Sequence, residues 1–267
     1  MLLTLLLACP GTEDRYCAPE GDFRELSVGS HHACAITTDG SLPVCWGRVG
    51  DTTPPAVPFD DISVNGQSSC GIKPTGAMEC WGQTQWTAPG GEWEQLSLGY
   101  DKGYAVSPEG EGVIWDSDEE YEAIGDLVHI SGGVDHFCAV RTDDTSYCID
   151  LETQPPQLDW DLLASSDGYT CGLTMAGAIH CWGNVPEAPI PTPPSGEGHE
   201  AIAPGWSHFC SLDADGVITC DGLEAPPELE DEQVWTDVGS GRNWACGLTD
   251  AGQVYCWGDC PDVEEEG

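Results

Sequence analysis

The spacing of the cysteines constrains this chain more than any other feature of its sequence. Twelve of the 15 cysteines form six pairs whose members are ten residues apart, or eleven in the first pair. The pairs are Cys34 with Cys45, Cys70 with Cys80, Cys138 with Cys148, Cys171 with Cys181, Cys210 with Cys220, and Cys246 with Cys256. From Cys34 to Cys246 the chain takes six steps over 212 residues, so the repeat is about 35 residues long. Seven such repeats account for almost all of the 267 residues.

Each repeat reads as an antiparallel β-hairpin with a glycine in its turn. Pairing Cys70 with Cys80 leaves a three-residue loop, in which Pro74 fixes φ and Gly76 supplies the left-handed residue. Cysteines directly opposite each other on antiparallel strands have their Cβ atoms within reach of a disulfide. The same turn signal recurs at Asp39-Gly40, Ala176-Gly177, Asp215-Gly216 and Ala251-Gly252.

Four of the repeats end in Cys-Trp-Gly, and this ending predicts how the repeats pack. Side chains alternate along a strand, so the cysteine and the tryptophan face opposite sides of their hairpin. Each disulfide should therefore pack toward one neighbouring repeat and each tryptophan toward the other. We expect these tryptophans to be core spacers: Trp46, Trp81, Trp182 and Trp257.

A single hairpin cannot bury both of its faces, so the copies must stack. Seven antiparallel units of this length close as blades around an axis, which also hides their strand edges. The sequence therefore predicts an all-β, seven-bladed β-propeller over residues 23–260, with an open β-sandwich as the alternative. Cysteines ten residues apart without a Cys-x-x-Cys knuckle do not match structural zinc spacing, so no metal site is predicted at the pairs.

The remaining cysteines point to export. The first residues, 1–9, form a short apolar run that ends in Leu-Leu-Ala-Cys and resembles the end of a bacterial lipoprotein signal peptide, with Cys9 as the lipidated residue. The run lacks the basic residues that usually begin an export signal. An ordinary, non-lipidated export signal and a chance resemblance both stay open. Lipidation of Cys9 would leave an even number of cysteines, with Cys17 and Cys260 as a seventh pair that fastens the two ends of the ring. We expect an extracytoplasmic protein, either lipid-anchored in a bacterial envelope or secreted.

The charge balance narrows the choice of partner. The chain has 47 acidic residues against seven lysines and arginines, for a net charge of −40. Such a surface repels phosphate backbones and anionic membranes, so we predict no nucleic-acid partner and membrane contact only through the lipid anchor. A solvated, highly soluble surface would explain the same charge. Residues 10–22 are expected to form an N-terminal tether and residues 261–267 an acidic tail.

Several stretches resemble the regulator-of-chromosome-condensation repeat family, in its exported, cysteine-containing bacterial form. They are residues 26–40 with Cys45-Trp46-Gly47, residues 133–140 and residues 205–212. The resemblance implies a seven-bladed propeller that binds proteins through its faces, and we expect a monomer. The short repeats imply three-stranded blades.

The chain also departs from the family pattern. Tyr104 and Ile114 replace the cysteines of the third repeat, and Asp221 replaces the tryptophan of the sixth. Short-repeat secreted relatives include a propeller that inhibits β-lactamases, so a secreted enzyme inhibitor is the alternative function.

The variable positions after each first turn are the candidate binding residues. Repeat symmetry places two such positions from each repeat on one rim, and Tyr100, Trp206 and Arg242 are residue types that anchor interfaces. Simple loop decoration is the other interpretation. The candidate residues are His31, Gln67, Tyr100, Asp101, Asp135, Asp167, Trp206, Arg242 and Asn243.

No motif points to catalysis. The sequence contains no nucleophile elbow, phosphate loop, zinc-protease helix or dinucleotide fingerprint. Ser207 and His208 are neighbours on a strand and face opposite ways. We therefore expect a binding module rather than an enzyme, with an enzyme or lectin that uses the central channel as a third possibility.

No cofactor is predicted. Residues 213–216 and 116–120 could bind calcium, but a hairpin turn and a solvated loop are the favoured interpretations. His32, His136 and His208 share one repeat position and could ring a metal. The family resemblance instead suggests that they are structural residues whose rings hydrogen-bond backbone.

Overall fold

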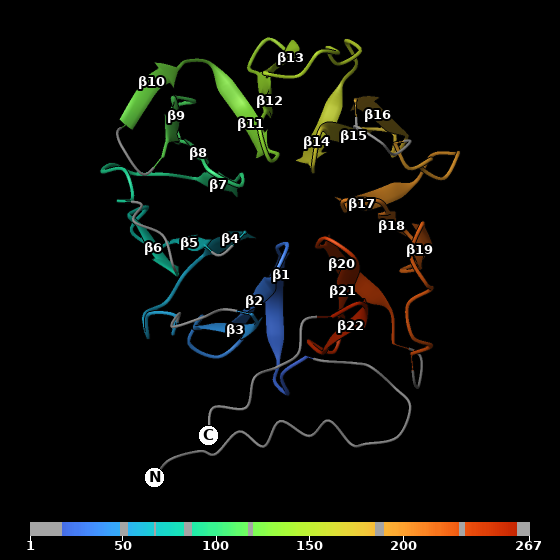
Figure 1. Ribbon diagram of the computed structural model, residues 1–267. Helices are drawn as coiled ribbons and strands as arrows, with labels where there is room; N and C mark the ends of the chain where they lie inside the picture. Colours follow the sequence, from blue (N-terminus) through green and yellow to red (C-terminus); the bar gives the residue numbers. More distant parts are fainter. Residues whose placement is uncertain are drawn as a thin grey trace.

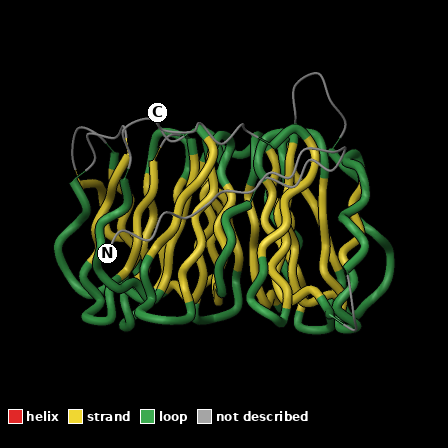
Figure 2. Tube along the Cα trace, turned by 90° about the horizontal axis from the view of Figure 1, so that it is seen from below, coloured by secondary structure: helices red, strands yellow, loops and turns green. Residues whose placement is uncertain are grey.

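The computed structural model describes residues 18–48, 53–66, 68–82, 87–116, 120–184, 190–229 and 233–260. Its strands form seven antiparallel sheets around a central axis (Figure 1), and the strands run between two loop-covered faces (Figure 2). The predicted seven-bladed propeller is confirmed. None of the described residues lies in a helix long and apolar enough to cross a membrane.

The blades are numbered in chain order, each starting with its innermost strand. Blade 1 contains β1 (Phe23–Val28), β2 (His32–Thr37) and β3 (Pro43–Gly47), blade 2 contains β4 (Asp61–Asn65), β5 (Ser68–Ile72) and β6 (Met78–Gly82), and blade 3 contains β7 (Gln95–Leu98), β8 (Gly103–Val106), β9 (Gly112–Trp115) and β10 (Glu120–Ile124). Blade 4 contains β11 (Leu127–Gly132), β12 (Phe137–Arg141) and β13 (Ser146–Ile149), and blade 5 contains β14 (Trp160–Ser165), β15 (Tyr169–Thr174) and β16 (Ile179–Gly183). Blade 6 contains β17 (His199–Pro204), β18 (Phe209–Asp213) and β19 (Ile218–Asp221), and blade 7 contains β20 (Trp235–Ser240), β21 (Trp244–Thr249) and β22 (Val254–Gly258).

The prediction of three-stranded blades is correct for six blades and incomplete for blade 3. There β10 pairs with β9 as a fourth, outer strand. This strand begins at Glu120, inside the acidic segment for which the sequence favoured a solvated loop. Residues 117–119 of that segment lie outside the described residues.

The hairpin register of the cysteines is as the sequence predicts. The paired cysteines lie directly opposite each other on the second and third strands of their blades, with Cα atoms 4.0 or 4.1 Å apart. In blade 3 the same register pairs Tyr104 with Ile114. Gly76 has a φ of 78°, the left-handed conformation that the turn requires.

All six predicted intra-blade bridges are formed. They join Cys34 to Cys45, Cys70 to Cys80, Cys138 to Cys148, Cys171 to Cys181, Cys210 to Cys220, and Cys246 to Cys256. The cysteine on the second strand is fully buried in every bridge. Its partner on the third strand is only half-buried in blades 1, 2, 5 and 6, where it is Cys45, Cys80, Cys181 and Cys220. In these blades the bridge therefore runs from the core toward the outer edge.

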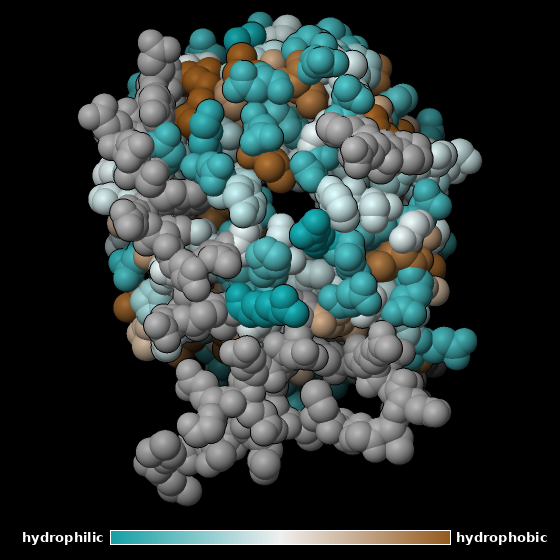
Figure 3. Space-filling view, in the orientation of Figure 1, coloured by the Kyte–Doolittle hydropathy of each residue, from teal (hydrophilic) through white to brown (hydrophobic). Residues whose placement is uncertain are grey.

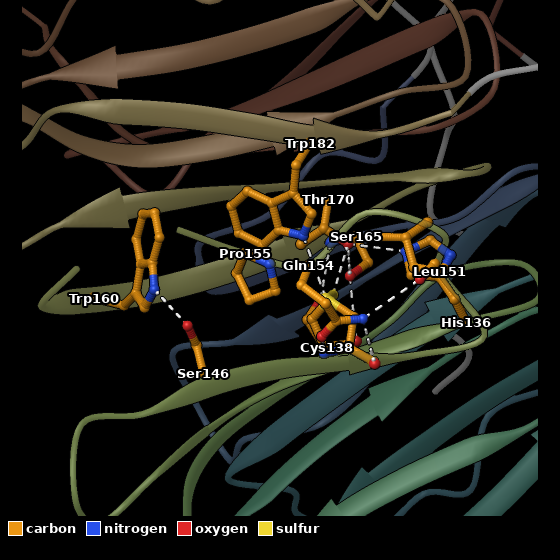
Figure 4. Close-up of a disulfide and its surroundings, with 12 residues drawn as sticks. His136, Cys138, Ser146, Leu151, Gln154, Pro155, Trp160, Ser165, Thr170 and Trp182 are labelled. Carbon is orange, nitrogen blue, oxygen red and sulfur yellow. Dashed lines mark hydrogen bonds between the residues drawn. A yellow bond between two sulfur atoms is a disulfide. The ribbon is translucent and has the colours of Figure 1, made fainter. Parts of the chain in front are cut away.

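Disulfides and tryptophans alternate around the ring as predicted. In blade 5, Trp182 packs against the Cys138–Cys148 bridge of blade 4, and its Nε1 donates a hydrogen bond to Cys148 Sγ at 3.2 Å (Figure 4). Trp46 also packs against the Cys246–Cys256 bridge of blade 7, although its indole nitrogen has no hydrogen-bond partner among the described residues. The tryptophan of one blade therefore covers the bridge of the preceding blade.

Blades 3 and 4 show what replaces this arrangement. Blade 3 has no bridge, and blade 4 has Ile149 rather than tryptophan after its last cysteine, so both parts are lost at the same junction. Tyr104 and Phe137 fill the space with ring centroids 5.2 Å apart, and Tyr147 packs edge-on against Phe137 at 6.1 Å. An aromatic stack therefore fills the space that a disulfide and an indole would occupy at this junction.

The ring closes by packing of blade 1 against blade 7. Phe23 N donates to Gly252 O at 2.8 Å, and Leu26 and Trp46 share a core cluster with Trp244 and Leu248. Ala18, in the segment before the first strand, also packs against this cluster, as does Cys260. The segment before the first repeat therefore does reach blade 7.

Three predictions about the termini are untested. Cys9 and Cys17 lie outside the described residues, as do residues 261–267. Lipidation of Cys9, the Cys17–Cys260 bridge and the acidic tail all stay predictions.

Candidate functional site

The inner strands line the central channel and present a row of hydroxyls to their neighbours. An inner strand lies at the edge of its sheet, so the N–H groups on its unpaired side need acceptors from outside the sheet. Serines of blades 1 to 4 supply them, because each Oγ accepts a hydrogen bond from a backbone N–H of the next blade. The pairs are Ser27 with Val64 N (3.0 Å), Ser63 with Leu98 N (3.0 Å), Ser97 with Gly132 N (2.9 Å) and Ser131 with Ser165 N (2.9 Å). We call these four contacts the serine ladder.

A second row of polar side chains runs beside the ladder. Glu25 Oε1 accepts from Ile62 N at 2.9 Å, Gln95 Nε2 donates to Val128 O at 2.7 Å, and His129 Nε2 lies 3.0 Å from Leu163 O. Burial and the charge of nearby Asp61 raise the pKa of Glu25, and the neighbouring positive charge of Arg24 opposes that shift. These side chains hold adjacent blades together and are not free to bind a ligand.

The polar rows stop at blades 5 and 6. In these blades the ladder position is occupied by Ala164 and Ala203, and the second-row position by Leu162 and Ala201. None of these side chains can accept a backbone hydrogen bond. The two halves of the channel wall therefore differ in chemistry.

The channel opens into a hollow on the face that carries the first turn of each blade. Its volume is about 490 Å³, and Figure 3 shows its mouth at the centre of the ring, surrounded mostly by hydrophilic residues. Five of the nine predicted rim residues line this hollow: His31, Tyr100, Asp167, Trp206 and Arg242. Repeat symmetry therefore brings more than half of the predicted set together at one site.

The other predicted residues lie elsewhere. Asp101 and Asp135 are exposed on the same face but do not line the hollow. Asn243 lines a separate, shallow depression between blades 6 and 7, together with Glu224. Gln67 lies outside the described residues.

Two aromatic residues and an arginine dominate the mouth. The side chains of Tyr100 and Trp206 are 51% and 38% exposed, which is unusual for large aromatic residues in a packed domain. The Arg242 guanidinium lies over the Trp206 ring, 4.4 Å from its centroid. Burial and the neighbouring positive charges of Arg242 and Arg48 lower the pKa of His31. Sequence reasoning missed Arg48, because it follows the last strand of blade 1 rather than a first turn.

The three histidines of one repeat position are interior residues, which confirms their structural role. Each is at most 2% exposed, and burial lowers the pKa of each to about 4. His136 Nε2 lies 2.8 Å from Thr170 Oγ1 of the next blade (Figure 4), and His32 Nε2 lies 2.7 Å from Ser69 Oγ. The prediction that these rings bond backbone is wrong for His136, whose partner is a hydroxyl. It is incomplete for His32, whose ring contacts the hydroxyl of Ser69 and also interacts with the backbone of Gly66. The interaction with Gly66 favours the charged form of the ring.

His208 lacks this partner. The residue that matches Ser69 and Thr170 in the next blade is Ala245, which has no hydroxyl. Neither ring nitrogen of His208 makes a hydrogen bond of ordinary geometry to the described residues, although the nearby Trp244 backbone slightly favours the charged ring. This buried ring is therefore neutral, and it lacks the hydroxyl partner that His32 and His136 have.

The candidate calcium segments have other structural roles where they can be described. Asp213 Oδ1 accepts hydrogen bonds from the N–H groups of Asp215 and Val217, which is the hairpin-turn interpretation. No group of three or more His, Cys, Asp or Glu side chains within the described ranges is arranged to hold a metal ion.

The serine ladder is the main functional feature that sequence reasoning missed. Its signal was present, since serine follows Leu26, Ile62, Leu96 and Ile130 at the same repeat position. A small hydroxyl repeated at a channel-facing position indicates a contact between blades.

Comparison with known proteins places this fold. No family model matches the chain. The chain is similar to the CRINKLY WD40 ectodomain of the Arabidopsis thaliana receptor kinase ACR4, with 21% identity and a TM-score of 0.73 over 90% of this chain and 98% of that chain. It is also similar to the ectodomain of the Physcomitrella patens receptor kinase CR4, with 19% identity and a TM-score of 0.70 over 91% and 74% of the two chains. A third similar structure is Prp20p from Saccharomyces cerevisiae, the yeast RCC1. It is 15% identical, with a TM-score of 0.65 over 90% of this chain and 83% of that chain.

At these identities the likeness concerns the fold alone, which is an RCC1-like propeller. The part of the expected family resemblance that concerns the fold is therefore confirmed.

Proposed function

We propose that this chain is an extracytoplasmic protein-binding propeller, held on a bacterial surface through lipidated Cys9, and that its partner docks on the mouth of the central hollow. The observation that carries the proposal is the convergence of Tyr100, Trp206 and Arg242 from three different blades on one hollow. Tryptophan, tyrosine and arginine are the residues that most often dominate the binding energy of protein interfaces. Here they are exposed at one place, on a rigid ring.

Two further observations support the location and the type of function. Six intra-chain disulfides are typical of a protein that folds in an oxidising compartment outside the cytosol. The solved structure of Prp20p was reported with its binding properties to Gsp1p and histones, so a propeller of this fold can serve as a protein-binding surface.

The proposal treats the chain as a binding module without a cofactor rather than as an enzyme. The three histidines that share one repeat position, His32, His136 and His208, are buried at blade junctions and cannot reach a substrate. General acid–base catalysis needs a titrating group within reach of a substrate proton.

Site-specific photocrosslinking tests the proposed face. A photoreactive residue at position 100 should capture one discrete protein from an envelope fraction of the source organism. The matched control is position 175, because Met175 is 73% exposed in a second turn, at the opposite end of its blade. Equal capture from both positions, or none from position 100, would contradict the proposal.

Two additional measurements test the lipid anchor and the alternative function as an inhibitor. Cys9→Ser should move the protein from the membrane to the soluble fraction, and an already soluble wild type would refute the anchor. If the captured partner is an enzyme, loss of its activity in the complex would identify the chain as a secreted inhibitor.

A further inference from the structure

We propose that the sector of the mouth formed by blades 7 and 1 binds a carboxylate, presented by an acidic side chain of the partner protein. This inference rests on the proposed function and names the chemistry of the group that the mouth recognises.

The six lysines and arginines that the structure describes are divided between the two faces of the ring. At the face opposite the hollow, each has a partner: Arg24 with Glu25, Lys73 with Glu79, and Arg141 stacked on Tyr147. At the mouth end, Arg48, Lys102 and Arg242 form no ion pair with any described residue. The chain has 47 acidic residues against seven lysines and arginines, so basic residues without a carboxylate partner among the described residues are unexpected at this end. They are therefore the groups with unused capacity for an anion.

Two of these arginines converge on one histidine. Arg48 N donates a hydrogen bond to His31 O at 2.9 Å, and His31 and Arg242 line the same hollow. Both positive charges disfavour protonation of His31, and no described carboxylate is among the causes that shift its pKa. Arg242 is also held by its stacking on Trp206, which occupies one face of the guanidinium and leaves its N–H edge open. A positioned guanidinium edge beside an imidazole matches the geometry of a carboxylate.

The opposite sector of the mouth confines the anion to this place. Asp167 lines the hollow from blade 5, on the far side of Trp206 from Arg242. A carboxylate would be repelled there and attracted at blades 7 and 1. The mouth is therefore electrically polarised across Trp206.

The net charge of the whole chain opposes an acidic ligand at long range, so the contact must act at short range. Charges farther apart than about 8 Å are largely screened at physiological ionic strength. A measurement at that ionic strength reports the local site.

The test uses an isosteric pair of capped amino acids, acetyl-Glu-amide and acetyl-Gln-amide, titrated into the full chain and followed by NMR. We expect acetyl-Glu-amide to shift the indole signal of Trp206 and to raise the pKa of His31. The neutral acetyl-Gln-amide should do neither. Equal effects of the two probes would overturn the inference.

Three variants sharpen the assignment. Arg242→Gln should weaken binding of acetyl-Glu-amide about tenfold, since it removes a charge-assisted contact. Arg141→Gln is the matched control, because it removes the stacked arginine of the opposite face and should leave binding unchanged. Asp167→Asn should tighten binding, since it removes the charge that repels a carboxylate from that side of the mouth, and weaker binding would contradict the assigned polarity. Unchanged binding in Arg242→Gln would refute the site.

The outcomes separate this inference from the proposed function. If crosslinking from position 100 succeeds and acetyl-Glu-amide fails to bind, the carboxylate site is refuted and the docking face stands. If the probe binds as expected and position 100 captures nothing, the docking proposal falls and the carboxylate site is then unrelated to it.

Discussion

The junction between blades 4 and 5 and the junction between blades 6 and 7 are built from the same repeat positions with different chemistry. Between blades 4 and 5, His136 bonds the hydroxyl of Thr170, and Trp182 donates to Cys148. The backbone N–H of Ser165 is bound by Ser131. Three polar contacts are therefore added to an apolar stack.

Between blades 6 and 7 the stack remains and these contacts are gone. His208 faces Ala245, Ala203 stands where the ladder has serine, and the indole nitrogen of Trp257 has no partner among the described residues. The apolar cluster around Leu212, Ile218 and Trp235 is intact. The disulfide and the apolar stack therefore suffice to place a blade, and we expect the polar contacts to determine how strongly a given junction resists unfolding.

The largest expected effect comes from removing one bridge at each junction. The Cys138–Cys148 and Cys210–Cys220 bridges both span ten residues, so loss of either should cost about the same chain entropy, on the order of 3 kcal/mol. Replacing Cys138 and Cys148 by alanine also removes the acceptor of Trp182, which should add about 1 kcal/mol. Chemical denaturation of the two double variants measures the difference, and equal losses would argue against the comparison.

The next largest effect is expected in the stability of the protein at acidic pH. Burial lowers the pKa of His208 from 6.5 to about 4. Below pH 6.5 His208 takes up a proton in the unfolded chain, whereas in the folded chain it does so only near pH 4. The free energy of unfolding therefore decreases as the pH falls through that window. His208→Phe should be tolerated, since blades 5 and 7 carry Tyr169 and Trp244 at the same repeat position.

Between pH 7 and pH 4.5 the wild type should lose about 2 kcal/mol more free energy of unfolding than the His208→Phe variant. The raised pKa values of Glu25 and Asp237 act in the opposite direction but are common to both proteins, so they cancel in the difference. Parallel stability curves for the two proteins would contradict the burial of a neutral ring.

The sequence predicts local contacts well and distant ones poorly. The bridges join residues ten or eleven apart, so alternation and turn chemistry determine their register. The contact between Ser27 and Val64 N instead spans more than one repeat and depends on how far each blade is rotated about the axis. That rotation is not encoded in any one hairpin.

The candidate site divides in the same way. Symmetry gathers the first-turn residues on one rim, but it does not say that Arg48, at the end of a third strand, lies near His31. The fourth strand of blade 3 is not predictable in the same way, because its first residues belong to an acidic segment whose composition is typical of a solvated loop.

A smaller effect is expected in the serine ladder. Ser131→Ala leaves the N–H of Ser165 without its acceptor, which should cost about 1 kcal/mol. Ser240→Ala is the control, because the buried Oγ of Ser240 has no partner within the described ranges, so its removal should be neutral or stabilising. Thermal unfolding of the two variants distinguishes them, and a greater loss in Ser240→Ala would refute the assigned role of the ladder.

Exchanging the histidine partners tests the central claim most directly. Ala245→Ser places a hydroxyl in the next blade where His208 can use it, and Thr170→Ala removes the hydroxyl that His136 uses. We predict that Ala245→Ser raises the free energy of unfolding by about 1 kcal/mol and that Thr170→Ala lowers it by about 1 to 3 kcal/mol. If Ala245→Ser leaves stability unchanged or lowers it while Thr170→Ala is neutral, the hydroxyl contact is not what separates the two junctions.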